Sequence, residues 1–282
     1  MAVLEFLPGS ELRPAAERAR QQVIDGKLDA IVVGGGDGSV RTVASVLAGS
    51  DIPLGIIPLG TLNHFAGDLG ISSVAERAVA TIAAGEQRAV DVGEVNNVIF
   101  VNNSSIGFYP YLVLERERRR RRKRLSKWIA MMLAMARVLR NLPLFRLTIV
   151  VEGNVEPCRS PCVLVGNNEY RITVPWFGTR ERLDSGELCL YVAKTQGRLS
   201  MFWLACSCIL GLVKRQQDLR IFKGATADIS ARRSRLLVAF DGEVATMRSP
   251  LHFKIRPGAL RVFASPIRSA NNSARATQSH PA

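Results

Sequence analysis

The sequence lacks the signatures of three classes of protein. Its five cysteines include no CxxC pair, which argues against both a zinc site and a disulfide framework. The apolar, uncharged run 199–213 has fifteen residues, whereas a membrane-spanning helix needs about 20. The chain does not open on a basic segment followed by an apolar one, as a secretory signal would. We therefore expect a reduced, cytoplasmic protein.

Both standard nucleotide-binding motifs are also missing. The chain contains no GxxxxGK[ST] loop, and Arg41 stands where the dinucleotide fingerprint would have its third glycine. What the chain has in excess is positive charge, because 38 basic residues against 24 acidic ones give +14 over 282 residues. Such a balance predicts an anionic partner or substrate, of the nucleotide, nucleic acid or lipid headgroup type.

The first ninety residues alternate strand and helix patterns. Residues 2–6 are predicted as a short strand and residues 13–26 as a helix. The apolar runs 30–33 and 54–58 are typical of parallel strands that are covered on both faces, and a helix pattern follows each of them. This order predicts a nucleotide-binding α/β domain with a parallel sheet over residues 1–90.

The remainder of the chain has a different pattern. Residues 91–267 carry short β-like runs separated by glycine, asparagine and proline, which predicts an antiparallel, β-sandwich-like domain with inserted helices. One inserted helix is expected near residues 111–142, and the other contains the uncharged run 199–213. The polar tail, residues 268–282, lacks periodicity and is predicted to be disordered.

Four glycines separate the first apolar strand from the helix that follows it. In GGGDGS, residues 34–39, glycine lets backbone N–H groups approach an anion, and the helix presents its positive end to the same place. Asp37 would repel phosphate in such a turn unless a cation lies between them, which indicates Mg2+. The alternative is a tight turn in which Ser39 caps the helix.

A second polar turn follows the next strand. The segment PLGTLN, residues 58–63, places Thr61 and Asn63 at the start of another helix. Because loops after parallel strands emerge at the same edge of the sheet, we expect the two turns to line one cleft. His64 would lie there and hydrogen-bond a phosphate or substrate oxygen, although a lone histidine is more often a neutral surface or packing residue.

Two carboxylates follow a late apolar strand. In FDGE, residues 240–243, Asp241 and Glu243 emerge where the strand ends. Phosphoryl transfer needs an acceptor hydroxyl in line, a group that takes its proton, and metal that offsets the phosphate charge. Asp241 is our candidate for the base, and Glu243 would orient it or help to hold metal. The alternative is a polar hairpin tip with Asp-Gly as its turn.

Together, GGGDGS, PLGTLN and FDGE resemble the motifs of the bacterial diacylglycerol kinase-like lipid kinases, which are related to sphingosine kinases and, more distantly, to NAD kinases and phosphofructokinases. The likeness covers nearly the whole chain, and PLGTLN joined to a late DGE is more specific than GGDG alone. It implies an ATP-dependent kinase and points to the same base, Asp241. The residues that it would place on ATP are Gly35, Gly36, Asp37, Gly38, Ser39, Val40, Arg41, Thr61 and Asn63.

A fourth stretch resembles the segment in which the family binds a structural Mg2+, partly through backbone carbonyls. It is RERLDSGELCLYV, residues 180–192. The metal ligands implied, together with Asp37 of the glycine loop, are Arg182, Ser185 and Glu187. Ser185 departs from the family, which usually has Asp at this position.

Two further departures concern the nucleotide side of the molecule. Family members generally have GTxND with an arginine shortly after, where this chain has His64 and Gly67. The family also begins with a strand that ends in an Asn-Pro turn, and no such strand precedes residues 2–14. A parallel sheet without that strand would lose part of its nucleotide pocket.

Half of the excess charge lies between Glu115 and Lys127, where nine residues are basic and two acidic. Such a run is ordinarily a solvated face or a linker, and it also binds nucleic acid nonspecifically. An apolar helical stripe follows it here, as in helices that lie among lipid headgroups. This predicts docking on the anionic inner face of a membrane, although the stripe would also fit against the β domain. The docking residues are Arg119, Arg120, Arg121, Arg122, Lys123, Arg124 and Trp128.

The leading hypothesis is therefore an ATP- and Mg2+-dependent kinase that phosphorylates a lipid hydroxyl, most simply converting diacylglycerol to phosphatidic acid. One alternative is a soluble enzyme of the NAD kinase type. Another is a noncatalytic relic of the kinase fold that binds anionic lipid or nucleic acid. We do not expect a nucleic-acid partner for the kinase. The oligomeric state stays open, because an edge strand that paired between two copies would give a homodimer.

Overall fold

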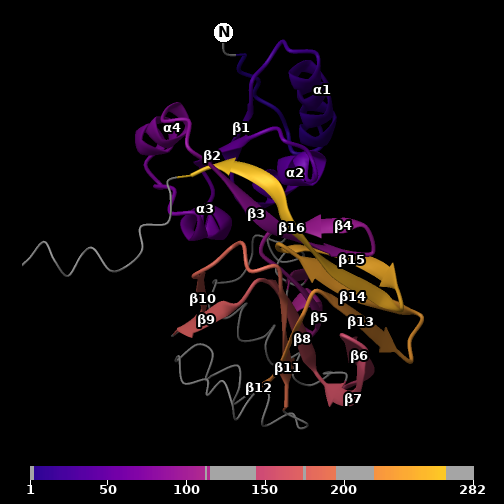
Figure 1. The fold of residues 1–282 in the computed structure, drawn as a ribbon. Helices are drawn as coiled ribbons and strands as arrows, with labels where there is room; N and C mark the ends of the chain where they lie inside the picture. The colour runs from indigo at the N-terminus through magenta and orange to yellow at the C-terminus, as the bar shows by residue number, and fades with distance from the viewer. Residues whose placement is uncertain (1–2, 112, 115–143, 174–175, 195–218, 265–282) are drawn as a thin grey trace, which may run out of the picture.

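The computed structural model describes residues 3–111, 113–114, 144–173, 176–194 and 219–264 (Figure 1). Helices gather in the N-terminal part and strands in the C-terminal part. The helices whose bounds are described are α1 (Leu12–Ile24), α2 (Asp37–Leu47), α3 (His64–Asp68) and α4 (Ala75–Ala83), and residues 108–111 and 113–114 are also helical. Within the described segments, no helix combines the length and the apolar character needed to cross a bilayer.

The first sheet runs through both parts of the molecule. Its strands are β1 (Ile31–Gly35), β2 (Leu54–Pro58), β3 (Gln87–Val95), β4 (Val98–Phe100), β6 (Phe145–Val151), β7 (Asn154–Ser160), β13 (Thr226–Ala231) and β16 (Leu251–Phe263). Strands β1 and β2 are parallel, as predicted, and the far end of β16 lies parallel to β2. Most of β16 pairs antiparallel with β3. The α/β part is therefore confirmed, with a mixed sheet.

The second sheet is antiparallel throughout and packs over the β-rich half of the first. Its order is β12 (Leu219–Gly224), β11 (Leu188–Ala193), β8 (Cys162–Asn167), β5 (Asn103–Gly107), β14 (Arg235–Phe240) and β15 (Glu243–Arg248). A short hairpin of β9 (Tyr170–Thr173) and β10 (Trp176–Arg180) lies beside it. Buried apolar side chains of both sheets, among them Ile149 and Val238, form the core between them. The predicted antiparallel β domain is confirmed.

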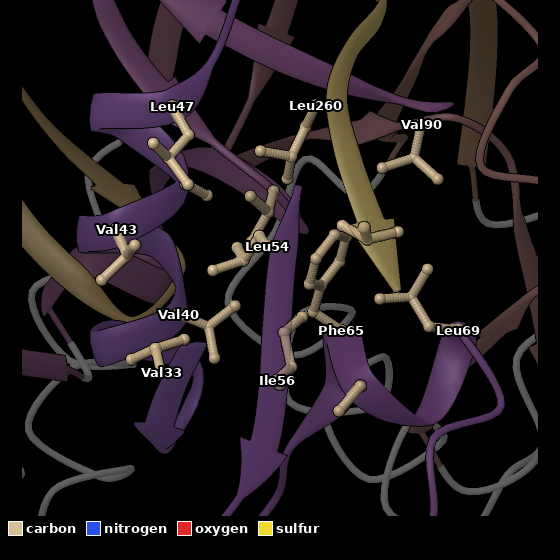
Figure 2. Close-up of a cluster of buried hydrophobic side chains, with 14 of the residues drawn as sticks. Val33, Val40, Val43, Leu47, Leu54, Ile56, Phe65, Leu69, Val90 and Leu260 are labelled. Carbon is tan, nitrogen blue, oxygen red and sulfur yellow. The ribbon is translucent and has the colours of Figure 1, made fainter. Parts of the chain in front are cut away.

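Helical and strand periodicity together build the core under the candidate site (Figure 2). Val43 and Leu47 lie on the inner face of α2 and are buried with Leu54 and Ile56 of β2. Leu260 of β16 joins the same cluster. A fully buried side chain of this size contributes about 1.5–3 kcal/mol. This packing fixes α2 against the sheet, so the turns that follow β1 and β2 have a rigid support.

The strand predicted at residues 2–6 is wrong. From residue 3 to residue 8 the chain forms no regular element, and Leu4 and Phe6 are exposed. Apolar alternation stabilises a strand only when a neighbour supplies hydrogen bonds and a face to pack on. In the described part of the chain, β1 pairs with β2 and with no other strand. Sequence pattern alone did not reveal that this segment has no partner.

Some predictions are not tested by the residues that the structure describes. The domain boundary at residue 90 stays a prediction, because β3 runs through it and β16 returns from the β-rich part to the α/β core. The run 199–213 and the tail 268–282 lie outside the described residues, as does most of the helix expected at 111–142. The residues proposed for membrane docking, 119–124 and Trp128, fall within that last gap.

Candidate active site

The two glycine-containing turns pack directly against each other. The N–H of Leu59 donates to the carbonyl oxygen of Gly35 at 3.0 Å. A Cβ atom added to Gly60 would lie 2.4 Å from the Cα of Gly36, so only glycine fits at this contact. The carboxyl ends of β1 and β2 thus bring GGGDGS and PLGTLN to one edge of the sheet.

Asp37 joins the two turns. Its carboxylate accepts hydrogen bonds from the backbone N–H groups of His64, at 3.2 Å, and Phe65, at 3.1 Å. These groups are at the start of α3 and would otherwise lack a partner. Asn63, in a left-handed conformation (φ 51°), holds its own turn by accepting from the N–H of Gly60 at 2.9 Å. Asp37 therefore connects the two loops by hydrogen bonds, and this role does not depend on a metal.

The first turn of α2 is suited to an anion. Gly36 is its N-cap and no side chain caps it, so the alternative in which Ser39 caps the helix is wrong. The N–H groups of the first turn have no intrahelical acceptor, and the helix dipole adds partial positive charge there. Thr61 and His64 are exposed in the neighbouring turn. Val40 is 2% exposed and belongs to the core, so its side chain supports the loop from below.

The FDGE motif forms a hairpin turn, and the carboxylate of Asp241 accepts hydrogen bonds from outside that turn. Asp241 and Gly242 both have positive φ, 46° and 85°, and Phe240 pairs with Glu243 across the turn. The hairpin alternative is thus geometrically correct. The side chain of Asp241, however, accepts from the backbone N–H groups of the loop before β5: Val101 at 2.7 Å, Asn102 at 2.8 Å and Asn103 at 3.2 Å.

This setting raises the pKa of the Asp241 carboxyl to about 6. Burial is the main cause, and it exceeds the opposing effects of the three backbone donors and of the Arg41 guanidinium. The residue as a whole is partly exposed, while its carboxylate is enclosed by those donors. A carboxyl that changes its charge near neutral pH is suited to general-base work.

Arg41 links the glycine loop to FDGE. Its side chain, 10% exposed, forms an ion pair with Glu243, and its guanidinium carbon lies 5.1 Å from the centre of the Phe240 ring. Its Nε is buried without a hydrogen-bond partner. The three motifs, far apart in the sequence, are therefore contiguous: α2 touches the second turn through Asp37 and the third through Arg41.

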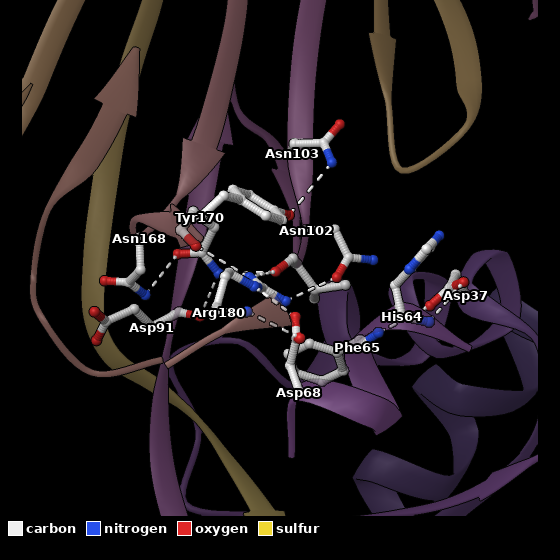
Figure 3. Close-up of polar contacts among 12 residues, drawn as sticks. Asp37, His64, Phe65, Asp68, Asp91, Asn102, Asn103, Asn168, Tyr170 and Arg180 are labelled. Carbon is white, nitrogen blue, oxygen red and sulfur yellow. Dashed lines mark hydrogen bonds and ion pairs between the residues drawn. The ribbon is translucent and has the colours of Figure 1, made fainter. Parts of the chain in front are cut away.

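Sequence reasoning missed the ion pair of Arg180 and Asp68 (Figure 3). Nε of Arg180 lies 2.7 Å from Oδ2 of Asp68, and the side chains are 0% and 5% exposed. Arg180 also donates to the carbonyl oxygen of Val101 at 2.7 Å and to Oδ1 of Asn102 at 2.8 Å. The loop that donates to Asp241 is thus held by Arg180 as well. No local pattern marks these two residues, since Asp68 ends a short helix and Arg180 ends a short strand.

The side chains of the fourth stretch, residues 180–192, interact with other groups of the protein. Oγ of Ser185 hydrogen-bonds Oδ1 of Asn168, and Arg182 pairs with Asp184 at 3.1 Å. The buried carboxylate of Asp91 accepts from the N–H groups of Gly186 and Gly258, at 2.7 and 2.8 Å.

These residues do not fit a structural metal. Glu187 is exposed, Ser185 is engaged with Asn168, and Arg182 brings a positive charge. Across the described residues, no group of three His, Cys, Asp or Glu side chains converges on a metal position. We derive no step through such an ion, and the ligand set stays a prediction.

Solved structures have this two-part fold. A crystal structure of a diacylglycerol kinase from Bacillus anthracis is similar with a TM-score of 0.67 and 24% identity, over 93% of this chain and 84% of that one. At this identity the match concerns the fold, which is that of a diacylglycerol kinase. The comparison therefore establishes the architecture of the chain.

The family follows from the sequence matches. Residues 7–95 match the diacylglycerol kinase catalytic domain, and residues 114–264 match the YegS C-terminal NAD kinase beta sandwich-like domain. The chain belongs to the diacylglycerol kinase-like family of lipid kinases.

Two curated relatives come from that family. The lipid kinase YegS of Escherichia coli is 41% identical over 83 residues, which are 28% of each chain. A diacylglycerol kinase of Mycobacterium tuberculosis is 41% identical over 136 residues, 45% of this chain and 42% of that one. The matched stretches thus span less than half of either relative.

Proposed function

We propose that this protein is a kinase that transfers the γ-phosphate of ATP to the hydroxyl of a lipid, with diacylglycerol as the acceptor and phosphatidic acid as the product. The observation that carries the proposal is the contact between Arg41 and Glu243, which joins α2 to the hairpin turn that contains Asp241. The names of the relatives support the lipid class, and one of them is called a diacylglycerol kinase.

The first turn of α2 would bind the nucleotide phosphates. Its unpaired N–H groups, from Asp37 to Ser39, point at the position that an anion prefers at a helix start. Thr61 and His64 would flank the phosphates from the second turn. Mg2+ would enter with ATP and offset charge on the transferred phosphate. We keep Asp37 as a ligand in the proposal: each oxygen of its carboxylate accepts one backbone hydrogen bond and so keeps a lone pair for the ion.

Asp241 would take the proton of the acceptor. Its Oδ2 accepts one hydrogen bond, from Val101, and so keeps a lone pair. In the transfer, the acceptor oxygen forms a bond to the γ-phosphorus, the bond from that phosphorus to the bridging oxygen of ADP breaks, and the hydroxyl proton moves to Asp241. A positioned base of this kind contributes roughly 10²–10⁴-fold to the rate.

The experiment is transfer of labelled γ-phosphate from Mg-ATP to a panel of lipids in anionic mixed micelles. Asp241→Asn is the test variant, and Asp228→Asn is the matched control, because Asp228 is an exposed carboxylate of the same part of the molecule, paired with His252. We expect phosphatidic acid from diacylglycerol with the wild type and the control, and at least a hundredfold less with Asp241→Asn, in line with the loss of a base. Equal activity of Asp241→Asn would remove the base assignment. Lipid binding without any phosphate transfer would favour a noncatalytic relic.

A further inference from the structure

Three arginines lie in a row across the first sheet, two of them on adjacent strands and the third directly after the end of β13. Arg146 of β6 and Arg159 of β7 are cross-strand partners. On the other side of β6, Ala231 of β13 pairs with Leu147, so Arg232 continues the register beside Arg146. All three are exposed. Neighbouring strands are about 4.8 Å apart, so the three side chains share one outward face.

Like charges directly opposite each other destabilise a sheet. The second sheet repeats the arrangement, because Arg235 and Arg248 are also cross-strand partners. Arg233, in the turn between β13 and β14, lies over the ring of Phe145 at 5.8 Å. We name the surface formed by Arg146, Arg159 and Arg232 the arginine face, because these three line one groove.

No carboxylate of the described residues balances the arginine face. The ion pairs described for the same strands involve other cations, Arg220 with Glu156 of β7 and His252 with Asp228 of β13. The charges of the face are therefore available to an external anion, which would remove the repulsion that the register imposes. A surface with unbalanced positive charges is complementary to an anionic partner.

A groove of about 550 Å3 runs along the arginine row. Besides the three arginines, it is lined by hydroxyl groups of Thr148 and Ser230 and by small or apolar side chains such as Leu147 and Pro157. Guanidinium and hydroxyl groups are the donors that phosphate oxygens prefer. Among the described residues, the lining contains no aromatic side chain, and single-stranded nucleic acid is usually held by aromatic stacking. The groove thus favours phosphate groups that carry no bases.

We propose that the arginine face docks the protein on the anionic phospholipid headgroups of a membrane. The choice of a bilayer among phosphate-bearing partners rests on the proposed lipid kinase function. Strand β14 begins at Arg235, three residues after Arg232, and runs to the FDGE motif, a distance of about 17 Å at 3.3 Å per residue. The face is therefore separate from the reacting atoms, and Figure 1 shows β6 and β7 at the end of the β-rich part away from α1 and α2.

The test uses the full chain and sedimentation with vesicles, without ATP. The variant carries Arg146→Gln, Arg159→Gln and Arg232→Gln. The matched control carries Arg18→Gln, Arg20→Gln and Arg77→Gln, which remove the same charge from exposed positions on α1 and α4. The vesicles are phosphatidylcholine with about 30% phosphatidylserine, so that each basic residue near the surface strengthens binding roughly fivefold. We expect at least a tenfold loss of binding in the variant and a much smaller loss in the control.

A thermal melt tests whether the variant is folded. Since the substitutions remove repulsion between cross-strand partners, we expect its Tm to equal or exceed that of the wild type. Turnover of a monomeric short-chain acceptor should also be unchanged, while turnover of acceptor in vesicles falls. If the wild type has no kinase activity, the vesicle experiment still tests the arginine face. Failure of the proposed kinase function is therefore distinguishable from failure of the docking proposal.

Four outcomes would overturn the proposal. Equal losses in variant and control would mean that net charge alone attracts the protein to vesicles. Unchanged vesicle binding in the variant, with loss of DNA binding, would assign the face to nucleic acid. A change of molecular mass in the variant would make it an interface between copies of the chain. Release from the vesicles by inorganic phosphate at constant ionic strength would indicate a site for single phosphate groups.

Discussion

The carboxylate of Asp68 and the guanidinium of Arg180 form a buried ion pair although 112 residues separate them in the chain. The backbone N–H of Arg180 donates to the second carboxylate oxygen at 3.1 Å, so both oxygens of Asp68 are engaged. Arg180 then holds the loop that donates three hydrogen bonds to Asp241. A single ion pair therefore fixes α3, which follows the PLGTLN turn, relative to the candidate base.

Breaking this pair should destabilise the protein strongly. We expect Asp68→Asn to lower the free energy of unfolding by about 3–5 kcal/mol, because it leaves the Arg180 charge buried without a counterion. Arg182→Gln is the matched control, since Arg182 forms an exposed pair with Asp184, and such pairs contribute about 0–1 kcal/mol. Urea unfolding followed by fluorescence measures both. Equal stabilities of Asp68→Asn and the wild type would contradict the role given to the pair.

The double variant Asp68→Leu with Arg180→Leu separates the cost of an orphaned charge from the value of the pair. Replacing both partners by apolar groups is often far less harmful than removing one. We expect the double variant to be more stable than Asp68→Asn, yet to lose kinase activity, because the Val101–Asn102 loop loses its donors. Retained activity would mean that the loop is positioned by its other contacts.

The parts of the fold that follow from local chemistry were predictable. Glycines at the ends of two apolar strands placed the two turns of the candidate site, and the predicted strand 54–58 is β2. The parallel pairing of β1 and β2 brings these turns to one edge of the sheet. Asp241 was singled out because Asp-Gly follows a strong apolar strand, and its role as the base stays a prediction.

What the sequence did not reveal depends on register and on distant partners. The pairing of Asp68 with Arg180 requires that β10 be placed against α3. Likewise, the basic run at 119–124 attracts notice in the sequence, whereas Arg146, Arg159 and Arg232 become a row only through the pairing of three strands. The segment 2–6 failed as a strand for the same reason, since alternation does not show whether a partner is present.

Gly60→Ala should disrupt nucleotide binding. The new Cβ would lie 2.4 Å from the Cα of Gly36, which forces apart the two turns that we assign to ATP. We expect a rise of about tenfold or more in the KM for ATP and a loss of stability of about 1–3 kcal/mol from overpacking. Gly67→Ala is the control, because nothing lies within 4 Å of its added Cβ. Initial rates at varied ATP concentration measure the effect, and an unchanged KM for Gly60→Ala would place the nucleotide elsewhere.

The activity should depend on pH through Asp241. Since the base must be ionised to take a proton, and the pKa of this carboxyl is about 6, kcat/KM should rise with pH up to about 6 and level off above it. Below the pKa we expect the rate to fall tenfold per pH unit, as the ionised fraction does. In Asp241→Asn the residual rate should lack this acidic limb. A limb of the same midpoint in Asp241→Asn would show that another group is titrating.

Arg41 should set the pH midpoint of the acidic limb of the kcat/KM profile. Its positive charge favours the ionised form of Asp241 and so lowers the carboxyl pKa from the value that burial alone would give. Arg41→Met removes the charge and keeps much of the side-chain volume over Phe240, so we expect the acidic limb to move to higher pH. Arg261→Met is the control, because Arg261 pairs with exposed Asp51. If the pH profile of kcat/KM for Arg41→Met kept the wild-type midpoint while its maximum fell, Arg41 would act on the nucleotide and not on the base.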